Sequence, residues 1–282
     1  MHFPACLPVR APLLELYVAS VGARLRADTI RSYISALAFF QAAAGFPPAP
    51  FAQPRLRLLL RGVRRLQRAA PGRPLRLPIT TRHLSVAFDF ARHSLSPYDA
   101  LVFRAAFSLA FFGLFRVSEF CCPGPRTFRP AADLGLGDLA FDLSRGIARI
   151  RLKVSKTDPF GRGCVVRLFR TNGALCPFSA LLRYYSLRRA RGPGPLFVLS
   201  DGRFLTRALV VGFLRAAFPH IPPSRLSSHS FRIGGASRLC ALGTPDATIQ
   251  AMGRWSSAAF RRYLRLSNSL VHSLHARMSF GP

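Results

Sequence analysis

The segment Pro71-Gly-Arg-Pro-Leu-Arg-Leu-Pro78 constrains the fold of this chain more than any other stretch. Proline has no backbone N–H and a fixed φ, so three prolines this close together exclude a regular helix or a central strand. We therefore expect an extended linker at residues 71–78. It would divide the chain into a helical N-terminal domain, residues 1–70, and a larger C-terminal domain, residues 79–282.

The composition indicates a folded protein with a polyanionic partner. The chain has 282 residues, 50% of them hydrophobic, and Phe alone accounts for 25. This much apolar surface can form a buried core, which excludes a disordered basic tail. The 41 Lys+Arg outnumber the 11 Asp+Glu, and the formal net charge is +30. An excess of this size on a folded chain favours nucleic acid or another polyanion as partner.

Several other classes of protein do not fit the sequence. The longest charge-free apolar run near the middle, Ala105–Phe115, is about half the length that a bilayer requires, so no membrane span is expected. Prolines at 4, 8 and 12 interrupt any signal peptide. The six cysteines form no CxxC pair and have no histidine at zinc-site spacing. They are predicted to be buried thiols in a reducing compartment, with no metal site.

Two helices are predicted in the N-terminal domain. The first has Asp28 as its N-cap and an apolar face of Ile30, Tyr33, Ile34, Leu37 and Phe40. The second runs from Pro54 to about Ala69, with an apolar side of Leu56, Leu59, Leu60, Val63 and Leu66. Its other face carries four arginines: Arg57, Arg61, Arg64 and Arg68. That stripe is either a solvated face or a contact with a phosphate backbone.

The C-terminal domain is predicted to be mainly helical with a small antiparallel sheet of three strands. Helical patterns cover 81–94 and 97–122 and resume at about 177. Between 147 and 154, apolar and basic residues alternate, which predicts a strand with Ile150, Leu152 and Val154 on its inner face. Residues 157–163 form a turn, and 164–169 form the returning strand.

Carboxylates are too scarce for many enzyme chemistries. Glu15 and Glu119 are the only glutamates, which argues against paired-carboxylate hydrolysis and a carboxylate metal cage. No P-loop, GxGxxG or GxSxG motif is present. An enzyme with this composition must use Arg, Lys, His, Ser and Tyr. That set suits phosphoryl transfer in which cationic side chains stabilise the developing charge.

Four segments carry residues of that set. In the first, the lone Arg116 follows a long apolar run, and in the second, Lys156 lies at the mouth of the predicted hairpin turn. The third places His229 and Arg232 three residues apart on one helix face. The fourth holds the only tryptophan and then a serine-capped helix that presents a tyrosine, Tyr263, among arginines.

In this order the residues resemble the active-site signature of the tyrosine recombinase (integrase) family: arginine, lysine, His-x-x-Arg, His or Trp, and tyrosine. All six positions are filled, by Arg116, Lys156, His229, Arg232, Trp255 and Tyr263. The motifs Gly-Arg-Trp and Phe-x-Arg-Tyr look most like those of eukaryotic mobile-element recombinases, such as DIRS-like retrotransposons and cryptons. The resemblance covers about residues 25–265. Phage and bacterial members usually have one more residue between the last two positions.

The resemblance implies a helical core-binding domain that clamps DNA, followed by a catalytic domain of the DNA breaking-rejoining fold. The expected activity is site-specific recombination through a 3′-phosphotyrosyl intermediate, for integration or excision of a mobile element. No ATP, metal or other cofactor is implied. Double-stranded DNA is the expected partner, and the nucleus the expected location. A homo-tetramer would form on DNA through the apolar tail residues Leu266, Leu270, Val271, Leu274 and Met278.

The family pattern also implies a role for each residue. Tyr263 would be the nucleophile, and Arg116 and Arg232 would hold the non-bridging oxygens of the scissile phosphate. Lys156 would protonate the leaving 5′-oxygen. Lys153 is the alternative, but it alternates with arginines on a polar strand face, where a solvated role is sufficient.

The remaining positions would assist this chemistry. His229 would help to deprotonate the tyrosine or orient the phosphate. The Trp255 indole N–H would donate to a phosphate oxygen. Glu119, three residues after Arg116 on the same helix face, would hold the cations of the site. Arg261 and Arg262 flank the nucleophile as further DNA contacts.

Three other functions stay open at this point. The chain can be a non-catalytic DNA-binding remnant of a mobile element, although drift would have removed isolated catalytic residues first. It can be a type IB topoisomerase, which shares the fold and the nucleophile. A basic RNA-binding protein is the third, and it would not explain the order of the motifs.

Overall fold

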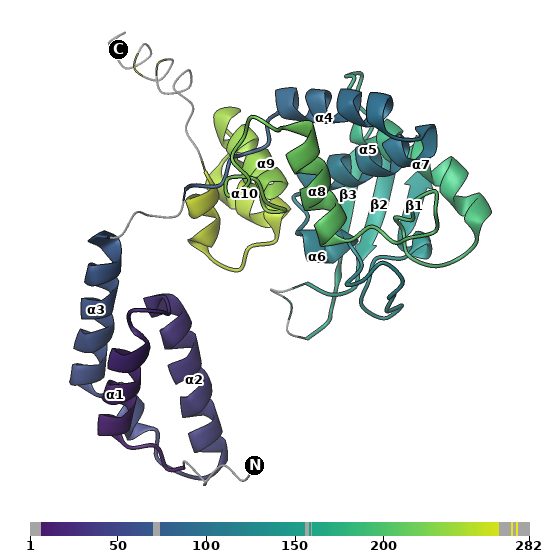
Figure 1. Ribbon diagram of the computed structural model, residues 1–282. Coiled ribbons are helices and arrows are strands. Elements are labelled where there is room, and N and C mark those ends of the chain that lie inside the picture. Colours follow the sequence, from purple (N-terminus) through teal and green to yellow (C-terminus); the bar gives the residue numbers. More distant parts are fainter. Residues whose placement is uncertain are drawn as a thin grey trace. The chain divides into compact units, whose positions relative to one another are not determined.

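The structure, a computed structural model, describes residues 7–69, 74–155, 158, 160–264, 272 and 275, with the backbone alone at 68, 69, 259, 262 and 263. The chain forms two compact units, Met1–Arg73 and Pro74–Pro282. In Figure 1 the first is coloured purple to dark blue and the second runs from blue to yellow. Lys156 and the tail residues 265–271 and 276–282 lie outside the described residues.

The first unit is helical in its described part. Its elements are α1 (Ala11–Val21), α2 (Ala27–Ala43), the 3-10 helix η1 (Ala49–Ala52) and α3 (Pro54–Ala69). Leu14, Val18, Ile30 and Ile34 form much of its core with residues of α3. The Gln67 side chain ties α3 to the turn between α1 and α2, because it accepts from the Ala27 N–H and donates to two carbonyls of that turn.

Parts of the predicted helix faces in this unit are wrong. The helix predicted to be capped by Asp28 begins at Ala27, and the Asp28 carboxylate instead pairs with Arg64 at 2.5 Å. Tyr33 and Phe40 are exposed rather than buried, and Leu66 is 77% exposed. In each case the helical period was right, but the unit has too few elements to cover a broad apolar face.

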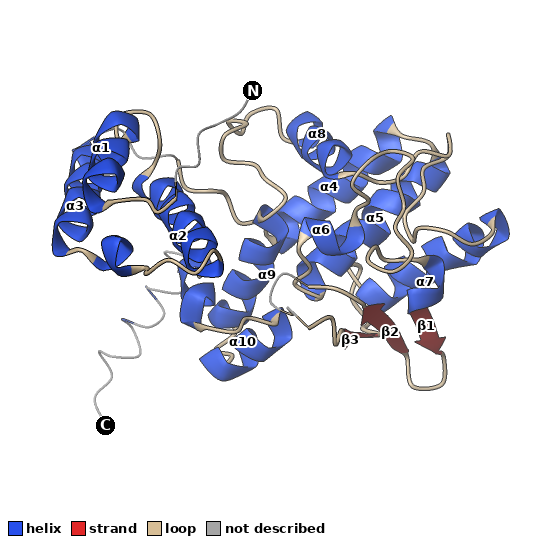
Figure 2. Cartoon of the chain, turned by 90° about the horizontal axis from the view of Figure 1, so that it is seen from below, coloured by secondary structure: helices blue, strands red, loops and turns tan. Residues whose placement is uncertain are grey.

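The second unit combines helices with one small sheet. Its helices are α4 (Thr81–Ser94), α5 (Pro97–Phe112), α6 (Val117–Phe120), α7 (Pro177–Arg188), α8 (Arg207–Ala217), α9 (Ser230–Ala241) and α10 (Asp246–Gly253). The 3-10 helices are η2 (Leu136–Asp138), η3 (Arg189–Arg191) and η4 (Ala258–Tyr263). The strands β1 (Leu139–Asp142), β2 (Ile147–Leu152) and β3 (Cys164–Phe169) pair antiparallel in the order β1-β2-β3, side by side in Figure 2.

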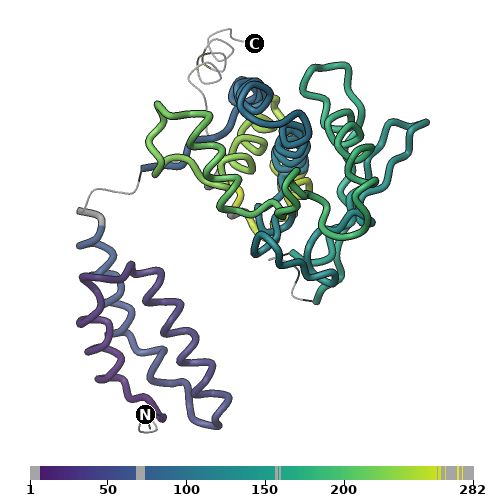
Figure 3. The backbone as a smooth tube through the Cα atoms, turned by 45° about the vertical axis from the view of Figure 1, so that its right-hand side comes forward, coloured from purple at the N-terminus to yellow at the C-terminus, as the bar shows by residue number. Residues whose placement is uncertain are grey.

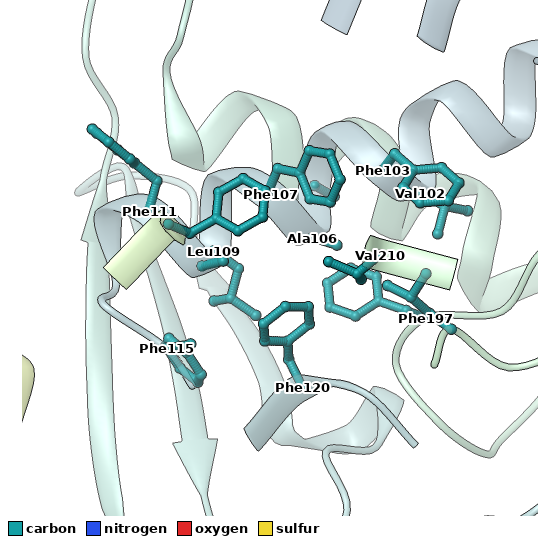
Figure 4. Close-up of a cluster of buried hydrophobic side chains, with 14 of the residues drawn as sticks. Val102, Phe103, Ala106, Phe107, Leu109, Phe111, Phe115, Phe120, Phe197 and Val210 are labelled. Atoms are coloured by element: carbon teal, nitrogen blue, oxygen red, sulfur yellow. The ribbon is translucent and has the colours of Figure 1, made fainter. Parts of the chain in front are cut away.

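Helix α5 forms the centre of this unit. It packs against α4, α7 and α9, and the chain path in Figure 3 shows its central position. Phe103, Phe107 and Phe111 recur along it at helical spacing and are buried together with Phe120 and Phe197 (Figure 4). Such a helix, apolar on nearly all sides, is expected only in a core. It provides a fixed base for the chain that follows it.

Two predicted boundaries in this unit are also wrong. The helix predicted over 97–122 ends at Phe112, and a separate short helix begins at Val117. Leu114 between them has φ +50, a left-handed conformation that a continuous helix excludes. The strand predicted to reach residue 154 ends at Leu152, so Val154 is 44% exposed. The five described cysteines are free thiols, and Cys121, Cys122 and Cys176 are buried.

The chain enters this unit along the N-terminal end of α9. The Leu77 N–H donates to the Arg225 carbonyl at 2.8 Å, and the Ile79 N–H donates to the Ser230 carbonyl at 2.9 Å. Gly234 permits this approach, since a Cβ there would lie 1.7 Å from the Ile79 carbonyl oxygen. The segment after the proline-rich stretch is therefore fixed against the residues around His229.

Candidate active site

Arg116 is held at the start of α6 by a buried carboxylate. It is the N-cap of this short helix, and its backbone N–H donates to Glu119 Oε2 at 2.8 Å. Its Nη1 donates to Glu119 Oε1 at 2.8 Å and to Ser155 Oγ at 2.9 Å. Ser155 Oγ in turn donates to Glu119 Oε1 at 3.0 Å. Glu119 thus contacts Arg116. The two residues are the third residue and the N-cap of the short helix α6, whereas the sequence analysis placed both on one continuous helix.

Glu119 is ionised despite its burial. Its side chain is 2% exposed, and burial by itself would raise its pKa. The positive charge of Arg254 and the hydrogen bonds from Arg116 outweigh that effect, so the pKa of Glu119 lies below its usual range. The carboxylate is therefore a fixed negative charge between two arginines.

Arg232 lies in the first turn of α9 and is fully enclosed. It is 2% exposed, and its two terminal nitrogens donate to the Leu114 and Gly253 carbonyls. Its guanidinium carbon lies 4.1 Å from the centroid of the Trp255 ring, a cation–π contact. In this structure Arg232 joins α9 to the ends of α5 and α10.

Trp255 lies two residues after the last residue of α10. Gly253 gives it room, because a Cβ at that position would lie 1.6 Å from the Trp255 ring. The indole also packs against Phe260 of η4, with ring centroids 5.6 Å apart. Element η4 ends at Tyr263. The helix predicted to present the tyrosine is a 3-10 helix, and only the backbone of Tyr263 is described.

The two helix ends that meet here have the same unusual geometry. Among the described residues, Leu114 and Arg254 are the only non-glycine residues with positive φ, at +50 and +57. Arg254 is the left-handed C-cap of α10, and Leu114 follows Gly113, the C-cap of α5; glycine is the residue usually preferred in a left-handed helix end. Arg254 Nη2 donates to the Leu114 carbonyl at 3.2 Å. Left-handed non-glycine residues gather at functional sites, where surrounding contacts offset their strain.

His229 precedes the first residue of α9 and is uncharged at neutral pH. Burial lowers its pKa, and the charges of Arg76, Arg207, Arg232 and Arg116 lower it further, to about 4. Its Nδ1 is buried and has no hydrogen-bond partner among the described residues. A neutral imidazole can accept a proton, as a general base requires.

The lysine position is only partly described. Lys153 is bound in the fold, since its Nζ lies 2.6 Å from Asp138 Oδ2 and donates to the Pro130 carbonyl at 2.7 Å. Lys156, the preferred candidate, lies outside the described residues. Its neighbour Ser155 contacts Arg116, so the hairpin that carries it reaches the site.

A cavity of about 360 Å³ opens beside these residues. It lies between the β2–β3 hairpin and the segment after α10, and its lining includes Ser155, Cys164, Arg254, Trp255 and Ser256. The lining also includes two charged side chains of opposite sign, Asp158 and Arg162. Within the described residues, no three His, Cys, Asp or Glu side chains are grouped so as to hold a metal ion. No helix in the described parts is long and apolar enough to span a membrane.

The predicted DNA-binding arginines belong to both units. Arg57 and Arg61 are exposed on α3 of the first unit, and Arg64 pairs there with Asp28. Arg68 belongs to the same helix, with its backbone alone described. In η4, Arg261 pairs with Asp246 at 2.9 Å. The side chain of Arg262 lies outside the described residues.

The structure adds residues that the motif did not indicate. Arg254 contacts Glu119, Ser155 bridges Arg116 and Glu119, and Arg76 and Arg207 act electrostatically on His229. In a sequence with this many arginines, nothing distinguishes these from surface ones. The adjacency of Arg254 to Gly253 and Trp255 was the single available signal.

Comparison with known proteins identifies the fold. The Tn1549 transposon integrase in complex with transposon right end DNA has a TM-score of 0.61 and 16% identity, over 99% of this chain and 88% of that chain. The XerH site-specific recombinase bound to palindromic difH substrate gives 0.60 and 14%, over 96% and 71%. The XerA recombinase gives 0.52 and 16%, over 96% and 91%. No protein-family model and no curated protein matches the sequence. The chain therefore has the fold of tyrosine recombinases, mainly helical with a three-stranded antiparallel sheet.

Proposed function

We propose that this protein is a tyrosine-type, site-specific DNA recombinase that cleaves and rejoins DNA through a 3′-phosphotyrosyl intermediate. The observation that carries the proposal is a convergence. Arg232 donates to the Leu114 carbonyl, two residues before Arg116, and its guanidinium lies against the Trp255 ring. Arg254, the neighbour of Trp255, and Arg116 both pair with Glu119. His229 is close enough for Arg116 and Arg232 to lower its pKa. A structural role for each residue alone would not bring them to one place.

The chemistry proposed for each residue is the one that the resemblance to tyrosine recombinases implies. Tyr263 attacks the scissile phosphate, and the neutral His229 accepts its proton or orients the phosphate. Arg116 and Arg232 stabilise the charge that develops on the non-bridging oxygens. DNA binding displaces the cover formed by Gly253 and Trp255, which exposes the Arg232 guanidinium. Lys156 then protonates the leaving 5′-oxygen, and the phosphodiester energy is kept in the tyrosyl bond.

Double-stranded DNA is the proposed substrate. The net charge of +30 favours a polyanion, and the Tn1549 integrase and XerH of similar fold are bound to DNA in their structures. The proposed biological role is integration or excision of a mobile element, of the eukaryotic type that the Gly-Arg-Trp and Phe-x-Arg-Tyr motifs resemble. Such an element would be recombined in the nucleus.

We also propose that the protein assembles as a homo-tetramer on DNA through its C-terminal tail. The residues Leu266, Leu270, Val271, Leu274 and Met278 carry this expectation and lie outside the described residues. Deletion of residues 268–282 should reduce the sedimentation coefficient of the protein–DNA complex. An unchanged coefficient would remove the tail from the assembly.

Covalent trapping without metal tests the central proposal. Purified protein and the Tyr263→Phe variant would be incubated with nicked DNA pools that include candidate element termini, then denatured and separated on a gel. We expect a DNA-linked protein in the wild type alone, attached through the 3′ end of the DNA. Equal DNA binding by both proteins with no adduct would favour the binding-remnant function. Relaxation of supercoiled DNA by a monomer, without pairing of two sites, would favour the topoisomerase.

A further inference from the structure

Arg254 occupies a position at which its residue type is unfavourable. It follows α10 with φ +57 and ψ +44, and its N–H donates to the Ala251 carbonyl while the next N–H donates to Gln250. These are the two bonds of a helix end that normally has glycine at this place. An L-residue with a long side chain is strained in this conformation. Contacts of the side chain must therefore offset the strain.

Those contacts lead to one carboxylate. Arg254 Nη2 lies 3.0 Å from Glu119 Oε2, and both side chains are nearly buried. Its Nη1 donates to the Gly113 carbonyl at 3.0 Å and Nη2 to the Leu114 carbonyl at 3.2 Å. The guanidinium also lies over the Phe115 ring, 4.8 Å from its centroid. Arg254 thus spans the whole turn between α5 and Arg116.

The carboxylate divides its two oxygens between two tasks. Oε2 accepts from Arg254 Nη2 and from the Arg116 backbone N–H. Oε1 accepts from Arg116 Nη1 and Ser155 Oγ. A carboxylate fixed at one oxygen by Arg254 presents the other in a single direction. The direction of the Arg116 guanidinium is then set by a residue that does not touch it.

We propose that Arg254 is a positioning residue that orients Glu119 and, through it, the guanidinium of Arg116. Its effect on catalysis rests on the proposed recombinase function. Its effect on Glu119 does not, because the contacts lie within the protein. The two parts can therefore be tested separately.

Glutamate labelling isolates the first part. Since Glu15 and Glu119 are the only glutamates, a protein labelled with carbon-13 at the Glu side-chain carboxyl gives two titrating signals, with Glu15 as internal reference. The ionisable groups that face Glu119 are Arg116, Arg254 and the Cys164 thiol, whose own pKa is raised by burial and further by Glu119. Replacement of Arg254 removes the largest of the charges that lower the Glu119 pKa. We expect that pKa to rise in Arg254→Gly and to rise less in Arg254→Lys.

The variants are chosen so that folding does not decide the result. Glycine suits φ +57 without strain, so Arg254→Gly removes the side chain and keeps the turn. The control is Arg203→Gln, which removes an arginine paired with Asp201 at 2.6 Å on the surface. It should leave the Glu119 titration unchanged. A Glu119 pKa in Arg254→Gly equal to that of the wild type would overturn the proposal.

Covalent trapping tests the second part. We expect Arg254→Gly to form the adduct about 10- to 100-fold more slowly, the range for partners that orient the ligands of a reactive centre. The acid limb of its rate profile should move to higher pH together with the Glu119 titration. In a Glu119→Gln background, Arg254→Gly should reduce the rate little further.

A rate reduction from Arg254→Gly that is equally large in the Glu119→Gln background would also overturn the proposal, because Arg254 would then act on another group. Absence of any adduct from the wild type would instead reject the recombinase function, and the titration would still decide whether Arg254 controls Glu119.

Discussion

Arg188 and Arg232 are two buried arginines that the same chain uses differently. Arg188 is 1% exposed and donates to the Gly192 and Pro195 carbonyls, four and seven residues further along the chain. Arg232 is 2% exposed and also donates to two carbonyls, but these belong to Leu114 and Gly253, 118 and 21 residues away. Burial and carbonyl pairing alone therefore do not mark a functional arginine. What distinguishes Arg232 is that its partners lie in two segments far apart in the sequence, each partner two residues before another predicted site residue, Arg116 or Trp255.

The strongest test of this comparison is a pair of lysine variants. A lysine at 232 has one ammonium in place of the planar fork, so it cannot serve both carbonyls and lie flat on Trp255. We expect Arg232→Lys to reduce adduct formation by about 100-fold or more, the usual cost of removing a transition-state donor. Covalent trapping measures this rate.

Arg188→Lys is the matched control. It replaces a fork that also serves two carbonyls, and we expect it to lower stability by about 1–3 kcal/mol while the folded protein keeps its cleavage rate. Equal reductions of cleavage rate in both variants, measured well below their melting temperatures, would end the distinction between the two arginines.

The second prediction concerns the packing that places Arg232. A Cβ at Gly234 would lie 1.7 Å from the Ile79 carbonyl oxygen, whereas one at Gly62 in α3 would meet nothing within 4 Å. We expect Gly234→Ala to cost about 1–3 kcal/mol or more because backbone must move. Gly62→Ala should instead stabilise by about 1 kcal/mol, since alanine is the better helix former.

Chemical denaturation of both variants checks this contrast. Similar stabilities for Gly234→Ala and Gly62→Ala would mean that α9 does not lie this close to Ile79. Arg232 would then lack the fixed support that separates it from Arg188.

The sequence predicted several elements and proposed a set of site residues. Periodicity predicted the helix over 81–94 and the strand pair, because both bury a regular apolar face. The order of the motifs proposed Arg116, His229, Arg232 and Trp255 as site residues without any knowledge of the distances between them. These are properties of residue type and spacing, which a sequence records directly.

Backbone geometry and long-range pairing were not predictable. Leu114 breaks a helix that its apolar pattern would continue, since leucine is a strong helix former and nothing local indicates a left-handed turn. The contact between Arg254 and Glu119 joins residues 135 positions apart. The burial of Arg232 was missed for the same reason, because a charged residue is expected to be exposed until its partners are known.

The third prediction concerns His229, whose pKa is lowered by burial and further by the charges of four arginines. Its pKa of about 4 lies below the ordinary value of 6.5. The unfolded chain therefore binds a proton more readily between these values, so the His229 contribution to stability falls as pH drops from about 6.5 to about 4. In His229→Gln this part of the decrease should be absent.

Denaturation of the wild type and of His229→Gln across this pH range measures the difference. The NMR titration of His229 should also move to higher pH when DNA is added, because a phosphate opposes the four arginines. Identical pH profiles for the two proteins would mean that neither burial nor the four arginines, Arg232 among them, lower the pKa of His229 in the folded protein.

The smallest effect is expected from a third kind of arginine, exposed on the surface of a helix in the first unit. Arg61 lies on the exposed face of α3, in line with Arg57, whose side chain donates to the Ala52 carbonyl. If both contact phosphates, Arg57→Gln with Arg61→Gln weakens DNA binding and reduces the slope of log K against log salt by about 0.9 for each phosphate that is no longer neutralised. Fluorescence anisotropy at several salt concentrations gives that slope.

The matched control is Arg203→Gln with Arg145→Gln, two exposed positions in loops of the second unit. If the slope of log K against log salt changed equally in both double variants, the α3 arginines would form a solvated face, the alternative that the sequence analysis left open. A change confined to α3 would separate two effects of arginine in this protein. The exposed arginines of α3 would set the affinity for DNA of any sequence, while the enclosed Arg232 would act only on the rate of the reaction.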